Sequence, residues 1–279
     1  MSTATAERWL AWDADRGFAT EAEADSMSSA ELAELLVADS WLVEHGEVRD
    51  LVHHQARFTA ACAQLGVFAP TVDRFWQQAV AELPRTGAWF PRVELRGGPA
   101  SSWVQLGLRL RPAPPLASTV RVLLWPAADP RRTPCRKGPD LPLLAELKAA
   151  AQTAGADDAL LIGRDGRVLE STTASLLWWE GDLLCLPDAE DRLLPGVTAE
   201  LIVRQATDLG IEVRRRPAGP ADLNGREAWL VNALHGIRPV TAWTGTGLRP
   251  GPAERAPNWQ RLLATSARPL PTPHGEKLT

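Results

Sequence analysis

Residues 159–187 read ALLIGRDGRVLESTTASLLWWEGDLLCLP and predict two successive β-hairpins. The first hairpin turns at Asp165-Gly166, a pair that suits the tight turn between two short strands. Residues 194–210, LPGVTAELIVRQATDLG, then predict a helix with proline and glycine at its front end. Short strands are expected at 212–217, 227–232 and 238–243. This mixture of hairpins, helix and strands predicts an α+β domain in the second half of the chain.

The first half of the chain predicts a second α+β domain. Helices are expected at 28–38, 53–66 and 71–83 from their apolar spacing, and a strand, a turn at His45-Gly46 and another strand at 41–51. Residues 89–98 and 103–112 alternate as paired strands do, and 119–125 form a more continuous apolar strand. The stretch AADPRRTP, dense in proline and charge, is the expected linker. The predicted division is a domain at 1–126, a linker at 127–136, a domain at 137–267 and a disordered tail at 268–279.

Composition excludes several classes of protein. The chain has 279 residues, 45% of them hydrophobic, and a formal net charge of −4, so nucleic-acid binding is not expected. It has no run of 18 apolar residues and no basic-then-apolar leader, so we expect neither a membrane span nor secretion. Three scattered cysteines suit reduced thiols in the cytoplasm, and the five histidines lack the spacing of metal ligands, so no metal is expected.

Lysine is rare in this chain, which draws attention to one position. Only Lys137, Lys148 and Lys277 occur. Lys148 is predicted on a helix and Lys277 in the tail, whereas Lys137 follows the linker and precedes a helix. A lysine that forms a covalent bond with a carbonyl cofactor must reach a pocket and lose its proton, which desolvation and nearby positive charge favour. Lys137 is the candidate; the alternative is a solvated lysine at a domain entrance.

Four further features fit a cofactor with a ring nitrogen and a phosphate. Glu170 lies where a predicted strand runs into small hydroxyl residues, although a surface glutamate is an equal alternative. The helix start at 194–198, LPGVT, offers free N–H groups to a phosphate, and Arg57 could bind the same group through its guanidinium. The turn after the predicted strand at 227–232 could also meet an anion.

Taken together, these segments resemble the fold-type IV family of pyridoxal-5′-phosphate (PLP) enzymes, the class IV aminotransferases. The resemblance covers about residues 37–243 and rests on five motifs in order: H-x-x-R-F at 54–58, the lysine before a helix, G-x-V-x-E with small residues at 166–173, L-P-G-V-T at 194–198, and N-A-L…P-V at 232–240. It implies a D-amino-acid-aminotransferase-like fold, with a smaller N-terminal α/β domain and a larger C-terminal domain built on a β-barrel-like core.

The resemblance also implies roles for particular residues. Lys137 would bind PLP covalently and then move protons, and Glu170 would pair with the pyridine nitrogen. The phosphate would be held by Arg57, Val197, Thr198, Asn232 and Ala233. Members of this family are usually homodimers, so a homodimer is expected.

Within the family, the motifs are closest to 4-amino-4-deoxychorismate lyase. The segment VNALHGIRPV has the N-A-L of those lyases and lacks the G-T-A-A of branched-chain aminotransferases, and Leu141 replaces a tyrosine that many of those aminotransferases carry. The implied reaction releases pyruvate and leaves 4-aminobenzoate, a precursor in folate biosynthesis. The alternatives are an aminotransferase acting on a branched-chain, D- or specialised-metabolite amino acid, and a catalytically silent PLP-binding homologue.

A small-molecule amine bearing carboxylates is therefore the expected substrate. Ser40 aligns with a threonine that assists catalysis in the lyases. Arg92 and Arg96 are candidates for the substrate carboxylates, since arginine binds them bidentately, and outward-facing strand arginines are the alternative. His235 is a further candidate substrate contact. The chain departs from the family pattern at Asp140, at Ser171 and over its first 27 residues.

Overall fold

A computed structural model describes residues 7–18, 33–98 and 103–272. The chain divides into two compact units. Unit 1 comprises residues 1–115, 136–139 and 266–279, and unit 2 comprises 116–135 and 140–265. The expected boundary at 126 therefore differs from the observed one, because the strand that crosses it belongs to unit 2. Residues 136–139 belong to unit 1, although the residues before and after them in the sequence belong to unit 2.

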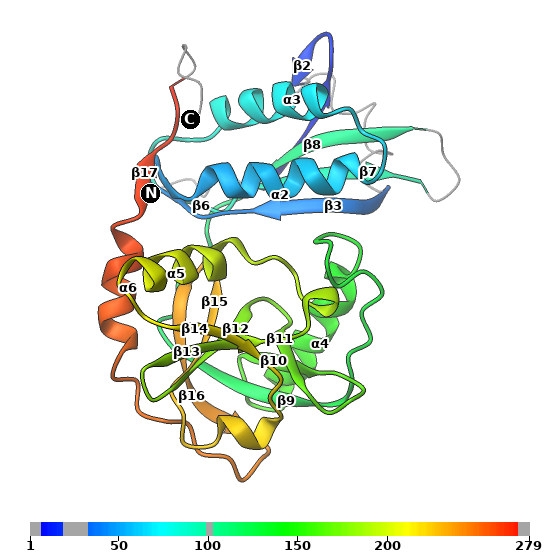
Figure 1. The fold of residues 1–279 in the computed structure, drawn as a ribbon. Helices are drawn as coiled ribbons and strands as arrows, with labels where there is room; N and C mark the ends of the chain where they lie inside the picture. The colour runs from blue at the N-terminus through cyan, green and yellow to red at the C-terminus, as the bar shows by residue number, and fades with distance from the viewer. Residues whose placement is uncertain (1–6, 19–32, 99–102, 273–279) are drawn as a thin grey trace. The chain divides into compact units, whose positions relative to one another are not determined.

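Unit 1 is built on a five-stranded sheet with the order β2-β1-β8-β7-β3 (Figure 1). Its strands are β1 (Arg8–Asp13), β2 (Gly17–Phe18), β3 (Glu34–Ser40), β7 (Arg92–Gly97) and β8 (Val104–Leu110). All neighbouring strands in this sheet run antiparallel. Strand β3 is therefore an edge strand, with one side open to pairing with another segment.

The two faces of this sheet differ, as expected for strands whose side chains alternate. Val93 and Leu95 of β7 enter a core shared with α2 (Leu51–Ala63) and α3 (Ala69–Ala81). The intervening residues of β7, including Arg92 and Glu94, point to the opposite face. The helices expected at 53–66 and 71–83 and the strands expected at 89–98 and 103–112 are confirmed.

A small second sheet completes unit 1, in the order β17-β5-β4-β6. It consists of β4 (Val43–Glu44), β5 (Glu47–Arg49), β6 (Ala88–Trp89) and β17 (Ala267–Pro269). The turn at His45-Gly46 is confirmed, with both residues at positive φ. The disordered tail predicted from residue 268 is wrong for its first part: β17 pairs with β5, and Leu270 is buried because its side chain joins the unit 1 core. Residues 273–279 lie outside the described residues.

The helix expected at 28–38 is also wrong where it can be compared. Residues 34–40 form β3, and residues 28–32 lie outside the described residues. The apolar residues Leu35 to Val37 satisfy a helical spacing and a buried strand equally well. Pairing with β7 decides in favour of the strand, since tertiary context overrides local propensity.

Unit 2 is built on an eight-stranded mixed sheet in the order β11-β10-β9-β16-β15-β12-β13-β14. Its strands are β9 (Val120–Ala128), β10 (Asp158–Ile162), β11 (Val168–Ser171), β12 (Ser175–Glu180), β13 (Leu183–Pro187), β14 (Val213–Arg216), β15 (Ala228–Asn232) and β16 (Gly236–Thr244). Both hairpins expected at 159–187 are confirmed as β10–β11 and β12–β13.

The sheet of unit 2 curls around one core and carries helices on its other face. Val168 of β11 and Cys185 of β13, from opposite ends of the strand order, share one apolar cluster. On the outer face, α5 (Val197–Asp208) and α6 (Ala256–Ala264) cover Trp229 and its neighbours. Helix α4 (Leu141–Thr153) packs against β10 and β11. The expected fold class, with a barrel-like core in the second domain, is confirmed.

Two short 3₁₀ segments, η2 (Glu190–Arg192) and η3 (Pro220–Leu223), connect strands and helices of unit 2. The stretch expected to be an interdomain linker is also part of this unit up to residue 135. Asp129 and Arg131 are both buried, because each finds an oppositely charged partner there. None of the helices in the described part of the chain has both the length and the apolar run needed to span a bilayer.

Candidate active site

Lys137 lies along the open edge of β3 in unit 1. The backbone N–H of Ala38 donates to the carbonyl of Lys137 at 2.7 Å. The next residue, Gly138, has φ +144°, and a Cβ at this position would lie 2.9 Å from the Cα of Val37. Only glycine can combine this backbone conformation with so close an approach. The edge of β3 therefore fixes the backbone on which Lys137 is carried.

The charge of Lys137 is easily lost. Burial lowers the pKa of Lys137 to about 8, Asp39 opposes the change, and Arg57, Arg111 and Arg92 add to it. Among the described residues, no hydrogen bond or ion pair engages the Nζ atom of Lys137. An amine that is half neutral near pH 8 and has no protein partner is suited to nucleophilic attack and to proton transfer.

A buried ion pair lies beside this segment. The Asp39 carboxylate accepts hydrogen bonds from Arg57 Nε and Nη2, both at 2.8 Å, and from His54 Nδ1 at 2.7 Å. Burial alone would raise the pKa of Asp39, but Arg57 and His54 hold it well below its usual value. Burial also lowers the pKa of His54, while Asp39 opposes this change. Arg57, predicted to bind phosphate, is thus held by a carboxylate that the motif search missed.

The face of the unit 1 sheet that points away from its helices carries a group of arginines around one carboxylate. Arg92 Nε, Arg96 Nε and Arg109 Nε donate to Glu94 at 2.6, 2.5 and 3.0 Å. Glu94 is fully buried, and although burial would raise its pKa, the arginines keep it below the usual value. Burial and the neighbouring Arg92 lower the pKa of Arg111 to about 10. We call Arg92, Arg96, Arg109 and Arg111 the arginine face.

Ser40 shares this face. It pairs with Arg92 across β3 and β7, and paired residues of antiparallel strands point the same way. Ser40 is buried, and its Oγ has no hydrogen-bond partner among the described residues. The structure therefore places three predicted residues, Ser40, Arg92 and Arg96, on the same side of one sheet. The sequence does not mark Arg109 and Arg111 as site residues, because the alternation in 103–112 predicts a strand and nothing more.

In unit 2, Glu170 ends β11 in a buried network of charges. Its Oε1 accepts a hydrogen bond from Leu194 N at 2.9 Å and a short one from Arg131 Nη1. Arg131 also binds Asp129, which accepts a further hydrogen bond from Arg192 at 2.6 Å. Burial raises the pKa of Glu170 against the opposing effect of Arg131. Both of these hydrogen bonds end on Oε1. They therefore orient the carboxylate without engaging its second oxygen, Oε2.

The same network fixes the approach to α5. Leu194 precedes Gly196, whose extended backbone starts the helix, and Val197 and Thr198 are the first two helical residues. A Cβ on Gly196 would lie 2.4 Å from Ser175 Oγ, so the helix start packs directly on β12. The hydrogen bond from Leu194 N therefore links Glu170 to the start of α5, where phosphate is expected to bind.

The turn between β15 and β16 is organised by Asn232. Its Oδ1 accepts hydrogen bonds from the backbone N–H groups of Leu234 and His235, at 3.1 and 2.8 Å. Asn232 therefore shapes the turn that carries Ala233. His235 Nδ1 accepts a hydrogen bond from Ala117 N at 3.2 Å, and burial together with Arg238 lowers the pKa of His235 to about 4. His235 is thus a neutral group at pH 7.

Asp140, which departs from the family pattern, also has a structural role. Its carboxylate accepts hydrogen bonds from the N–H groups of Arg132 and Thr133 at 3.1 and 2.8 Å. It closes the turn of unit 2 that precedes the Lys137 segment.

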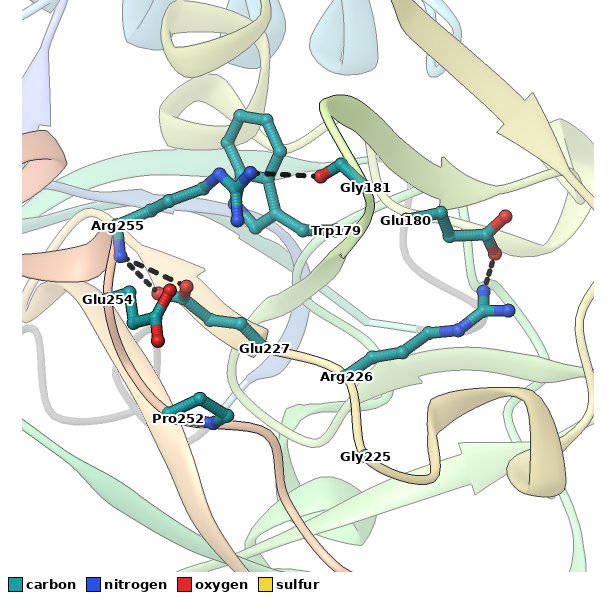
Figure 2. Close-up of a pocket in the computed structure, with 9 residues that line it drawn as sticks. All are labelled: Trp179, Glu180, Gly181, Gly225, Arg226, Glu227, Pro252, Glu254 and Arg255. Carbon is teal, nitrogen blue, oxygen red and sulfur yellow. Dashed lines mark hydrogen bonds and ion pairs between the residues drawn. The ribbon is translucent and has the colours of Figure 1, made fainter.

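A pocket of about 350 Å³ lies elsewhere in unit 2 (Figure 2). Arg255 lies over the Trp179 ring, 4.7 Å from its centroid, and donates its backbone N–H to Glu227, while Glu180 pairs with Arg226. The Arg255 side chain pairs with Asp182 at 2.8 Å. None of the residues proposed from the sequence lines this pocket, which is formed by Trp179, Glu180, Gly181, Gly225, Arg226, Glu227, Pro252, Glu254 and Arg255.

Comparison with known proteins identifies relatives of this arrangement. Residues 36–243 match the family model described as amino-transferase class IV. Aminodeoxychorismate lyase of Bacillus subtilis is 31% identical over 85 residues, which are 30% of this chain and 29% of that protein. A probable branched-chain-amino-acid aminotransferase of Rickettsia felis is 35% identical over 92 residues, 32% of this chain and 31% of that protein. Each aligned stretch thus covers less than a third of the relative.

A solved structure extends the likeness over almost the whole fold. A hypothetical aminotransferase from Mycobacterium tuberculosis, in a PLP-bound form, has a TM-score of 0.74 at 18% identity. The match covers 93% of this chain and 98% of that one. At this identity the likeness concerns the fold.

Proposed function

This chain belongs to the class IV aminotransferase family, and from that premise we propose that it is a lyase that eliminates pyruvate from 4-amino-4-deoxychorismate to leave 4-aminobenzoate. Its cofactor is PLP, as in family members solved with PLP bound. PLP supplies an electron-withdrawing ring that stabilises negative charge on the carbon next to the substrate amine.

The residues present fit this cofactor. Lys137 offers an amine with a lowered pKa and no partner for its Nζ in the described part of the chain. The start of α5 presents the N–H groups of Val197 and Thr198, a favourable end of a helix for phosphate. We propose that Lys137 carries PLP, that Glu170 faces the ring nitrogen, and that Arg57, Val197, Thr198 and the turn with Asn232 and Ala233 hold the phosphate.

The arginine face is the observation that carries the choice of substrate. Four arginines share this face with the carboxylates of Glu94, which is buried, and Glu7, which pairs with Arg109. Arg92 and Arg111 also lower the pKa of Lys137. Such an excess of positive charge favours a substrate with more than one carboxylate. Aminodeoxychorismate has two carboxylates, whereas a branched-chain amino acid has one carboxylate and an apolar side chain.

The proposed chemistry then follows from the residues of this chain. Neutral Lys137 Nζ removes the proton from the substrate carbon that bears the amine. The enolpyruvyl group leaves the neighbouring ring carbon, the ring becomes aromatic, and the departing group takes up a proton to become pyruvate. Arg92 and Arg96 would orient the substrate carboxylates, Ser40 lies on the same face to contact the leaving group, and His235 would contact substrate as a neutral imidazole.

The deciding experiment supplies aminodeoxychorismate to the purified protein and measures both products. We expect 4-aminobenzoate and pyruvate in equal amounts, and loss of both with Lys137→Ala. An aminotransferase is the second candidate, supported by the 35% identity to the Rickettsia felis protein. Conversion of the bound cofactor to its amine form by branched-chain or D-amino acids, without pyruvate, would favour that candidate. A protein that binds PLP and turns over none of these substrates would be a silent homologue.

A further inference from the structure

Asp39 is a buried carboxylate of unit 1 that accepts hydrogen bonds from several donors, yet the proposed reaction gives it no role. It is fully buried near the end of β3. Besides Arg57 and His54, it accepts a hydrogen bond from the backbone N–H of Ser40 at 2.7 Å. Four donors on one carboxylate fix its position and, in return, the orientation of each donor.

We propose that Asp39 is a positioning residue for the cofactor: it orients the guanidinium of Arg57 for the phosphate while its own strand holds Lys137. This inference rests on the proposed cofactor role of Arg57. It adds a residue that has no part in the family motifs identified in the sequence.

The geometry of α2 and β3 supports this assignment. His54 and Arg57 are three residues apart and so lie on one face of α2, which packs against β3 (Figure 1). Asp39 receives Arg57 through Nε and Nη2 together, a bidentate pairing that fixes the guanidinium plane as well as its place. His54 holds the other side of the same carboxylate.

Strand β3 brings this pair into register with Lys137. Ala38 pairs with the Lys137 backbone along the edge of the strand, and Asp39 is the next residue, with its side chain on the helix-covered face. Ser40 then points to the arginine face. Three successive residues of β3 therefore have three different roles. Ala38 binds the Lys137 backbone, Asp39 binds Arg57, and Ser40 presents its hydroxyl to the arginine face. A shift of Asp39 would therefore change the distance between Lys137 and Arg57.

A second histidine–aspartate pair on α2 provides a matched control. His53 Nδ1 lies 2.5 Å from Asp50 Oδ1, three residues away, and His53 is exposed. Asp50 has φ 54°, a conformation that asparagine tolerates well. Asp50→Asn therefore removes a carboxylate that pairs with a histidine of α2, as Asp39 does, but leaves the contacts between Asp39 and Arg57 in place.

The test is a double-mutant cycle on cofactor affinity. Apoprotein is titrated with PLP, and binding is followed by the visible absorbance band at about 410–420 nm. We expect Asp39→Asn and Arg57→Gln each to weaken PLP binding about tenfold or more, the loss typical of a charged hydrogen bond. The double variant should bind no more weakly than Arg57→Gln alone, and Asp50→Asn should bind as the wild type does. Pyridoxal, which lacks the phosphate, should bind equally to wild type and Arg57→Gln.

Additive losses in the cycle, or wild-type PLP affinity in Asp39→Asn, would overturn the proposal. If Asp39→Asn does not fold, Arg57→Lys takes its place: it keeps the positive charge but cannot make the bidentate contact. The proposal requires Arg57→Lys to lose affinity as Arg57→Gln does, and full affinity in Arg57→Lys would refute it. Failure of the proposed function is distinguishable: a protein that binds PLP but does not release pyruvate from aminodeoxychorismate would refute the lyase assignment and leave this cycle on PLP affinity unchanged.

Discussion

Arg131 binds two carboxylates in the interior of unit 2. It binds Asp129 through Nε and Nη2 and Glu170 through Nη1, and all three residues are buried. Removal of one partner from such a group leaves a buried charge without compensation, which costs more than the interaction itself contributes.

We therefore expect Arg131→Met to lower the free energy of unfolding by about 3–5 kcal/mol. Urea denaturation of the apoprotein measures this change. Arg121→Ala, which breaks an exposed ion pair with Asp157 in the same unit, is the control and should alter stability little. Equal effects of the two substitutions would contradict the view that burial of Arg131 matters.

The lowered pKa of Lys137 gives a pH dependence whose direction follows from the charge. Below about pH 8 Nζ is protonated and cannot attack a carbonyl, and above it the neutral amine accumulates. Labelling of apoprotein by pyridoxal, trapped with borohydride and measured by mass spectrometry, should rise with pH with a midpoint near 8. Lys137→Ala should lose this labelling, and a midpoint near 10 would show an ordinary solvated lysine.

The same pKa shift has a consequence for stability. The folded state holds Lys137 at a lower pKa than the unfolded chain, so from about pH 8 to 10.5 the unfolded state binds more protons. The contribution of Lys137 to the free energy of unfolding therefore rises as pH increases through that range. A difference in the slope of stability against pH between wild type and Lys137→Met measures it, and parallel slopes would contradict it.

At the scale of elements, the join between β3 and residues 136–139 depends on one glycine. Gly138→Ala would place a Cβ 2.9 Å from the Cα of Val37 at a φ of +144°. We expect a stability loss of about 1–3 kcal/mol and weaker PLP binding, since the Lys137 backbone must move. Gly66→Ala is the matched control in unit 1, with positive φ and nothing within 4 Å of the added Cβ. Thermal unfolding and PLP titration of both variants separate backbone strain from displacement of Lys137.

Elements that carry a periodic pattern or a tight turn could be predicted from the sequence. The hairpins at 159–187, helices α2, α3 and α5, and the turn at His45-Gly46 follow from local residue preferences, and the structure confirms them. Strand β3 could not be predicted, because its leucines fit a helix as well as a strand and only pairing with β7 distinguishes the two. The scarcity of lysine indicates Lys137, and the motifs around it add Glu170 and Arg57 as candidates.

The partners of these residues could not be predicted in the same way. Arg131 lies in the stretch predicted to be a linker. Its burial depends on pairing with Glu170, 39 positions along the chain, and local sequence does not reveal that pairing. Asp39 lies just after the helix predicted at 28–38, and no motif in the sequence marks its carboxylate as buried. Charge pairing over long sequence distances leaves no local signal.

At the scale of the whole molecule, cofactor binding should appear as added stability. A ligand at 100 times its dissociation constant adds about 2.7 kcal/mol when it binds only the folded state. We expect the melting temperature to rise when PLP is added to apoprotein, and the rise to be lost or much reduced in Lys137→Ala. An equal rise in both proteins would show that PLP binds without Lys137.

The assembly is a separate prediction at this scale. We propose a homodimer, as is usual for this family, and light scattering should then give twice the chain mass of 30.3 kDa. A mass of one chain in the holoenzyme would refute this expectation.

The brief passage of residues 136–139 through unit 1 has a consequence for how the molecule can be divided. Unit 1 is made of three separate stretches of chain, and the stretch with Lys137 is covalently joined to unit 2 at both ends. No single cut, whether by a protease or by the design of a split gene, yields one fragment that contains all of unit 1 and another that contains all of unit 2. A fragment ending at residue 115 keeps Asp39, Arg57 and the arginine face but loses the lysine that they surround. Neither unit can therefore be exchanged for that of a relative by one crossover without parting Lys137 from the strand that carries it.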